Sequence, residues 1–130
     1  MRTRQLRQTV SIQAPTQAVY RALVNSRQHS RITGSRARIG TKVGSAFSVW
    51  DGGVSGFTLA LERNRRIVLA WRSSDWPAGH FSIVSFAFRK AGAATRLVLE
   101  QHGIPAGAYR DIADGWKTYY WQPMKDVLER

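Results

Sequence analysis

His80 and Ser82 have the residue types and the spacing of a base and its nucleophile. Residues two apart in a strand point to the same face, so the imidazole and the hydroxyl could meet. No acid stands where it could orient the imidazole, as a catalytic triad would require. We therefore expect His80 to anchor a loop, and the sequence predicts no catalytic residue.

Metal chemistry has equally little support in the sequence. The chain contains no Cys, which excludes disulfides, thiolate ligands and a cysteine nucleophile. His29 and His102 lie far apart, and no pair of histidines has the spacing of metal ligands. Asp51 and Asp75 fall in turns, where Asp bonds its own backbone. We predict neither a metal ion nor another cofactor.

The elements that would position any site follow from hydrophobic periodicity and turn residues. A first strand is expected at 5–13, followed by two short helices, the first opening at Pro15 and the second spanning 26–33 with Ser26 as its N-cap. Strands are expected at 36–39, 45–50, 54–62, 67–71, 80–90 and 95–102, and a helix at 108–129. Pro123 should kink that helix, because it cannot donate to the carbonyl of Tyr119.

Short turns between successive strands make the sheet antiparallel, and its apolar face needs a cover. The last helix alone has enough apolar surface to supply it. The sequence thus predicts an α+β fold in which a curved antiparallel sheet of six or seven strands surrounds a long C-terminal helix. At 130 residues, a single domain spanning 1–130 is expected.

Five short motifs occur in order along this pattern. Residues 51–56 read DGGVSG, 67–72 read IVLAWR, and 75–82 read DWPAGHFS. Residues 95–105 read TRLVLEQHGIP, and 115–125 read GWKTYYWQPMK. Together they resemble the C-terminal domain family of the activator of heat-shock protein 90 ATPase, within the SRPBCC (START/Bet v-like) superfamily. The resemblance runs from about Val10 to Leu128.

This resemblance implies a helix-grip fold with a cavity between the sheet and the C-terminal helix. It also implies two alternatives to plain ligand binding: a co-chaperone that contacts a protein, and a cyclase- or aromatase-like enzyme in which Gln101, Tyr120 and His29 would move protons. Binding proteins and enzymes share this scaffold, so the fold does not choose among them. Of these functions we favour non-catalytic ligand binding in the cavity.

The periodicity of each predicted strand and helix shows which residues face inward, and these residues form the expected wall of the cavity. Its polar members, such as Gln101 and Tyr120, need hydrogen-bond partners that a ligand or the backbone would supply. The candidate ligand-binding residues are Phe47, Val49, Leu59, Leu69, Trp71, Val84, Phe86, Leu99, Gln101, Ile112, Trp116, Tyr119, Tyr120 and Met124. The expected ligand is a small hydrophobic or aromatic molecule, with or without an acidic group.

Charge is distributed unevenly. The net charge is +12, and residues 1–50 contain nine basic residues but no Asp or Glu. An acidic protein partner is therefore an alternative to a merely solvated surface. Nucleic acid is not expected, because the arginines are scattered and form no known motif. Arg72 should point away from the cavity and pair with Asp75 or another acid; the alternative is that it anchors an anionic group at the rim.

No segment approaches the roughly 20 apolar residues that span a bilayer. A soluble cytoplasmic protein without a membrane partner is expected, as a monomer or a homodimer. The identity of the ligand and any reaction cannot be derived from the sequence.

Overall fold

The computed structural model describes all 130 residues, and a seven-stranded sheet forms its frame. The strands are β1 (Thr3–Ile12), β2 (Arg38–Ile39), β3 (Ala46–Val49), β4 (Val54–Glu62), β5 (Arg66–Ser73), β6 (Ser82–Ala91) and β7 (Ala94–Pro105). Their order across the sheet is β1-β7-β6-β5-β4-β3-β2, and all neighbours are antiparallel. The predicted curved antiparallel sheet is confirmed.

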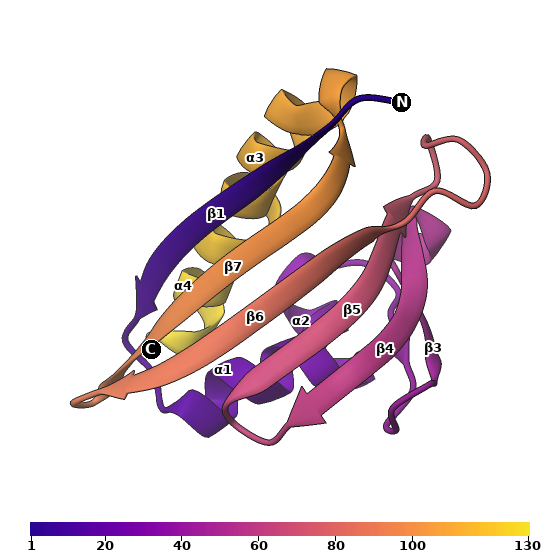
Figure 1. Cartoon of the computed structure of the whole chain (residues 1–130). Coiled ribbons are helices and arrows are strands. Elements are labelled where there is room, and N and C mark those ends of the chain that lie inside the picture. Colours follow the sequence, from indigo (N-terminus) through magenta and orange to yellow (C-terminus); the bar gives the residue numbers. More distant parts are fainter.

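All helices cover one face of this sheet (Figure 1). The first two are α1 (Thr16–Val24) and α2 (Ser26–Thr33), and the C-terminal segment comprises α3 (Tyr109–Trp116), η3 (Lys117–Trp121) and α4 (Gln122–Leu128). Two short turns, η1 (Trp50–Gly52) and η2 (Ala106–Ala108), complete the chain. In Figure 1, α3 and α4 lie behind β1 and β7, whereas α1 and α2 lie toward β6 and β5. On that face, the C-terminal segment therefore covers only the part formed by β1 and β7.

The long C-terminal helix is interrupted differently from the predicted kink. Segment η3 is a π-helix, and it directly precedes the turn that holds Pro123. Proline has no N–H to give to the carbonyl four residues earlier, and a widened turn absorbs that loss. Tyr120 and Trp121 are both buried, whereas Tyr119 is 56% exposed. The expectation that Tyr119 faces inward was wrong, because helical spacing of 3.6 residues does not hold through this turn.

The second helix begins and ends on recognisable caps. The Asn25 side chain accepts a hydrogen bond from the backbone of Gln28 at 3.0 Å, so Asn25 is the N-cap in place of Ser26. The Ser26 hydroxyl instead accepts from the backbone N–H of Ile39 at 2.8 Å. Gly34 ends the helix at φ 73°, as predicted. Ser26 thus connects α2 to strand β2 through this hydrogen bond.

Strand β4 contains a register shift. The regular alternation of its apolar residues in the sequence gives no sign of it. The shift falls between Thr58 and Ala60, so Leu59 is the extra residue of a β-bulge. Thr58 points inward, whereas Phe57 and Leu59 are 48% and 45% exposed. The inward placement predicted for Leu59 was therefore wrong. Gly56 is required nearby, because a Cβ there would overlap the Ala70 carbonyl oxygen.

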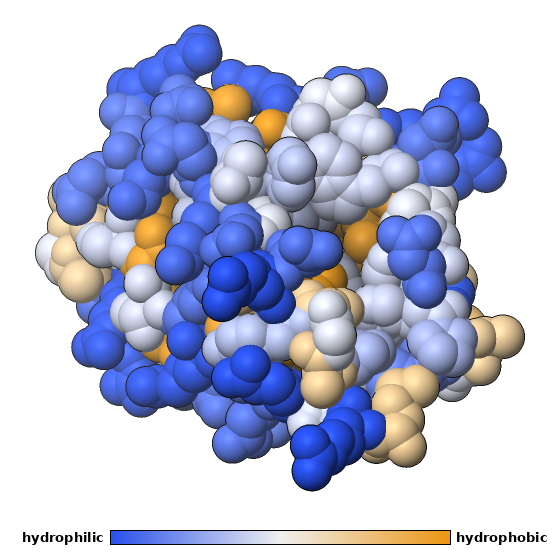
Figure 2. Space-filling model, turned by 90° about the horizontal axis from the view of Figure 1, so that it is seen from above, coloured by the Kyte–Doolittle hydropathy of each residue, from blue (hydrophilic) through white to orange (hydrophobic).

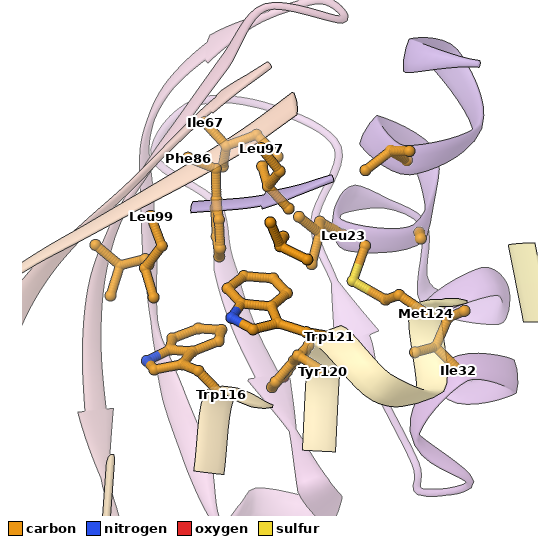
Figure 3. Close-up of a cluster of buried hydrophobic side chains, with 14 of the residues drawn as sticks. Leu23, Ile32, Ile67, Phe86, Leu97, Leu99, Trp116, Tyr120, Trp121 and Met124 are labelled. Atoms are coloured by element: carbon orange, nitrogen blue, oxygen red, sulfur yellow. The ribbon is translucent and has the colours of Figure 1, made fainter. Parts of the chain in front are cut away.

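The interior is one cluster of buried hydrophobic residues between the helices and the sheet. Figure 3 shows the rings of Trp116 and Trp121 directed toward Phe86, Leu97 and Leu99 of the sheet. The two indoles stack with centroids 5.6 Å apart. The face shown in Figure 2 is mostly hydrophilic, with small hydrophobic areas scattered between the polar side chains. No helix has both the length and the apolar character needed to cross a bilayer.

Candidate functional site

The concave face of the sheet has two unlike parts. One part, here the packed half, is formed by β1, β7 and β6 and is filled by side chains from α3, η3 and α4. The other, here the hollow half, is formed by β3, β4 and β5 and faces α1 and α2. It contains an open pocket of about 610 Å³. Pockets of this size hold drug-sized molecules.

Half of the predicted ligand-binding residues line this pocket. They are Phe47, Val49, Leu69, Trp71, Phe86, Trp116 and Tyr120. Four others are buried but do not line it: Val84, Leu99, Gln101 and Met124. These four face inward as predicted, yet they belong to the packed half, where neighbouring side chains occupy the space.

The remaining three predicted residues lie elsewhere. Ile112 and Tyr119 line a smaller depression of about 280 Å³, and Leu59 lies on the outer face. The rings of Trp71, Trp116 and Tyr120 line both this depression and the large pocket. These three rings therefore form a wall between the two spaces, with Trp116 and Tyr120 centroids 4.8 Å apart.

The polar groups of the packed half satisfy one another. Trp116 Nε1 donates to Gln101 Oε1 at 2.8 Å, and Gln101 Nε2 donates to Ser82 Oγ at 3.0 Å. The Ser82 hydroxyl donates in turn to the Trp71 carbonyl at 2.8 Å. This chain of hydrogen bonds leaves no free group for a ligand. Gln101 is thus a structural bridge between strand and helix, and the role expected for it at a pocket was misplaced.

A second polar chain lies in the wall of the hollow half. Trp50 Nε1 donates to Tyr120 Oη at 3.0 Å, and Tyr120 Oη lies 3.0 Å from His29 Nε2. An indole N–H only donates, so the Tyr120 oxygen accepts that bond. The other ring nitrogen of His29, Nδ1, is buried without a protein partner. The wall of the pocket thus contains an unsatisfied polar group.

Burial keeps these groups neutral. It lowers the pKa of His29 from 6.5 to about 4, and it raises the pKa of the Tyr120 phenol. The imidazole is consequently uncharged at neutral pH. Among the three groups proposed for an enzyme, the structure brings His29 and Tyr120 together and places Gln101 in the packed half.

Trp50 reaches Tyr120 from a strained turn. Its φ is 55° and that of Asp51 is 53°, left-handed values that are uncommon for residues other than glycine. The Trp50 ring packs edge to face on Tyr119 and Tyr120, with centroids 5.5 and 5.9 Å away. These contacts and the Tyr120 bond offset the backbone strain, which costs on the order of 1–3 kcal/mol per residue.

Three arginines lie at the opening of the pocket. Arg21 on α1, Arg27 on α2 and Arg63 in the β4–β5 turn all line it, and all three are exposed. No Asp or Glu lines the pocket. Only Arg66–Glu62 and His102–Glu100 approach as ion pairs, so the three arginines are unpaired. We name them the rim arginines.

Apart from His29, which was proposed only for the enzyme alternative, the residues that α1 and α2 contribute to the pocket were not among the predicted site residues. They include Leu23 and Val24, whose apolar helical face was visible in the sequence, and Tyr20 beside them. Nothing in the sequence indicated that this face lies opposite β4 and β5. Thr58 was missed because the bulge after it reverses the alternation of the strand.

The loop before β6 has a structural role. His80 Nε2 lies 2.7 Å from the Gly103 carbonyl, which confirms it as a loop anchor. Ser82 bonds to Trp71 and Gln101, so the two residues form no nucleophile–base pair. Arg72 donates to the Trp76 carbonyl at 2.8 Å, and the predicted pairing with Asp75 was wrong. No group of three or more His, Cys, Asp or Glu is arranged to hold a metal ion.

Comparison with known sequences gives a family match over most of the chain. Residues 13–129 match the family described as "Activator of Hsp90 ATPase homolog 1-like protein". The chain is 31% identical over 110 residues to the human "Activator of 90 kDa heat shock protein ATPase homolog 1", covering 85% of this chain and 32% of the human protein. It is 29% identical over 126 residues to an uncharacterised Schizosaccharomyces pombe protein, covering 97% of this chain and 38% of that protein. The chain thus spans about a third of the length of these relatives.

Solved structures share the fold at low sequence identity. An Hsp90 activator from Plasmodium falciparum superposes with a TM-score of 0.91 at 24% identity, covering 96% of both chains. A Mesorhizobium loti protein superposes with a TM-score of 0.84 at 22% identity, covering 98% of both chains. The helix-grip architecture is therefore common to this chain and these proteins.

Proposed function

The chain belongs to the activator of Hsp90 ATPase homolog 1-like family, and from that premise we propose that it is a non-catalytic binding protein whose hollow half holds a small hydrophobic or aromatic molecule. The observation that carries this proposal is the pocket of about 610 Å³. Thirteen of its 22 lining residues are hydrophobic, so burial of an apolar ligand is favourable there.

The contrast between the two polar chains supports a binding role. In the packed half, Gln101, Ser82 and Trp116 satisfy each other, as expected for a finished core. In the hollow half, His29 Nδ1 is buried without a partner, although such a group costs about 1–3 kcal/mol. If the pocket had no ligand, an apolar residue in place of His29 would avoid this cost. The presence of His29 therefore supports a binding role.

A fluorescent probe without charge tests the apolar pocket alone. N-Phenyl-1-naphthylamine should bind wild-type protein with increased emission, and Leu69→Trp should weaken saturable binding because the added ring occupies part of the pocket. Leu59→Trp is the matched control, because it adds the same ring to the exposed outer face. Equal binding by both variants would place the probe outside the pocket, and no binding by wild type would contradict the proposal.

A second function is favoured by the family match itself. The human relative is named an activator of the heat-shock protein ATPase, and the match covers 85% of this chain. We propose as the alternative that this domain contacts an Hsp90-type chaperone. The nine basic residues of the first fifty, with no acidic residue among them, would suit an acidic surface.

The ATPase rate of a purified Hsp90 chaperone separates this alternative from ligand binding. If the chain is a co-chaperone, adding it should raise the rate, and 0.5 M NaCl should weaken the effect because exposed charges are screened. Leu69→Trp should leave the stimulation unchanged. An unchanged ATPase rate at a hundredfold molar excess of the chain would exclude stimulation by this domain alone.

A further inference from the structure

We infer that the ligand of the hollow half carries one acidic group, such as a carboxylate, which the rim arginines hold at the opening while an aromatic or aliphatic body fills the pocket. This inference rests on the proposed binding function and deepens it. Its basis is the arrangement of charge around the pocket, which differs sharply between rim and interior.

The rim carries positive charge from three separate elements. Arg21 comes from α1, Arg27 from α2 and Arg63 from the β4–β5 turn, so positive charge reaches the pocket from three separate elements. None of the three forms an ion pair, and no carboxylate lines the pocket. A charged ring without counter-ions raises the local concentration of an anion and orients it on entry.

Arg63 and Tyr20 of the first helix both line the pocket. Burial raises the pKa of the Tyr20 hydroxyl on α1, and the nearby positive charge of Arg63 partly offsets that rise. Arg21 and Arg63 line the same pocket, and an acidic group held by both would meet two donors.

The interior of the pocket disfavours a charge of either sign. Its buried lining residues are apolar apart from Thr58, Tyr20, Tyr120 and a neutral His29. An unpaired carboxylate placed there would lose its hydration without compensation. The acid must therefore stay at the rim, which fixes the direction of the ligand: body inward, acid outward.

A pair of near-isosteric ligands tests this directly. 1-Naphthaleneacetate and 1-naphthaleneacetamide share the same ring system and differ in the carboxylate. Wild-type protein should bind the acetate about 10- to 30-fold more tightly, since several exposed charge pairs each contribute modestly. In 1 M NaCl the preference should fall below about threefold, because the screening length shrinks to about 3 Å.

Two triple variants separate the rim from the total charge. Arg21→Gln/Arg27→Gln/Arg63→Gln removes the rim charges, and its acetate preference should fall to about one while acetamide binding persists. Arg7→Gln/Arg89→Gln/Arg96→Gln removes the same charge from exposed residues that do not line the pocket, and should keep the preference.

The outcomes distinguish this inference from the binding function beneath it. Equal affinity for acetate and acetamide in wild type would overturn the acidic ligand and leave an apolar binding protein. An equal loss of preference in both triple variants would overturn the role of the rim arginines. Failure to bind either compound would overturn the binding function as well.

Discussion

The packed half and the hollow half share one sheet, yet only the packed half is filled. In the packed half, Leu97 and Leu99 are fully buried beneath the rings of Trp116 and Trp121. In the hollow half, Leu69 and Leu61 are only partly buried and line the pocket. The difference lies in the cover, because the C-terminal segment crosses β1 and β7 and leaves β3–β5 to the short helices.

This comparison teaches that polar satisfaction separates a core from a site more clearly than hydrophobicity does. Both halves are lined mainly by apolar residues. Gln101 and Trp116 bond to each other, whereas His29 Nδ1 and the rim arginines have no partner within the chain. His29 and the rim arginines all line the pocket, whereas Arg72, whose Nε is also buried without a partner, does not.

The largest difference between the halves is expected from removing a leucine. Leu99→Ala should lower the free energy of unfolding by about 3–4 kcal/mol, because it opens a cavity in a filled core. Leu69→Ala should cost less than about 1.5 kcal/mol, since its side chain already borders open space. Urea unfolding monitored by tryptophan fluorescence measures both. Equal losses would mean that the hollow half is also filled in solution.

Acid should destabilise the hollow half through His29. The folded pKa of about 4 lies below the ordinary value of 6.5, so the unfolded chain takes up the proton first. Stability is complete above about pH 7, falls between pH 6.5 and 4, and has lost about 3 kcal/mol from this group below pH 4. Urea unfolding at several pH values should show that loss in wild type.

Two glutamine variants isolate this contribution from that of the carboxylates. His29→Gln should remove the part of the acid sensitivity that comes from the buried imidazole. His102→Gln changes an exposed histidine and should retain the wild-type profile. Parallel profiles for wild type and His29→Gln would show that His29 is solvated and titrates normally.

A smaller contrast is expected from removing polar groups. Gln101→Leu should cost about 2 kcal/mol, because it leaves the Trp116 N–H buried without an acceptor. Thr58→Val should change stability by less than about 0.5 kcal/mol, since the Thr58 hydroxyl faces the pocket and makes no hydrogen bond that the fold needs. Thermal unfolding of both variants gives the comparison, and a large loss in Thr58→Val would reverse it.

Much of the fold followed from the sequence because alternation and turn residues are local signals. The strand spanning Val54–Glu62, helix α2 and the antiparallel order were predicted in this way. Two inward placements failed at irregularities that change the residue period. Leu59 sits in a β-bulge, and Tyr119 sits in a π-turn before Pro123.

The candidate site was harder to predict, because it depends on distant contacts. Most of the pocket residues of β3 and β5 were identified, since their inward phase was regular. The pairing of His29 with Tyr120 joins residues 91 positions apart, and no local pattern reports it. The rim arginines resembled the other scattered arginines until the fold placed them around one opening.

The central claim is that the hollow half, and not the packed half, receives a ligand. Methyl NMR during titration with 1-naphthaleneacetate tests it most directly, because aromatic rings shift nearby methyl resonances. Leu23, Val49 and Leu69 should shift saturably, while Val84, Leu97 and Leu99 stay in place. Shifts confined to the exposed Leu59 and Ile83, or no shifts at millimolar ligand, would contradict the account.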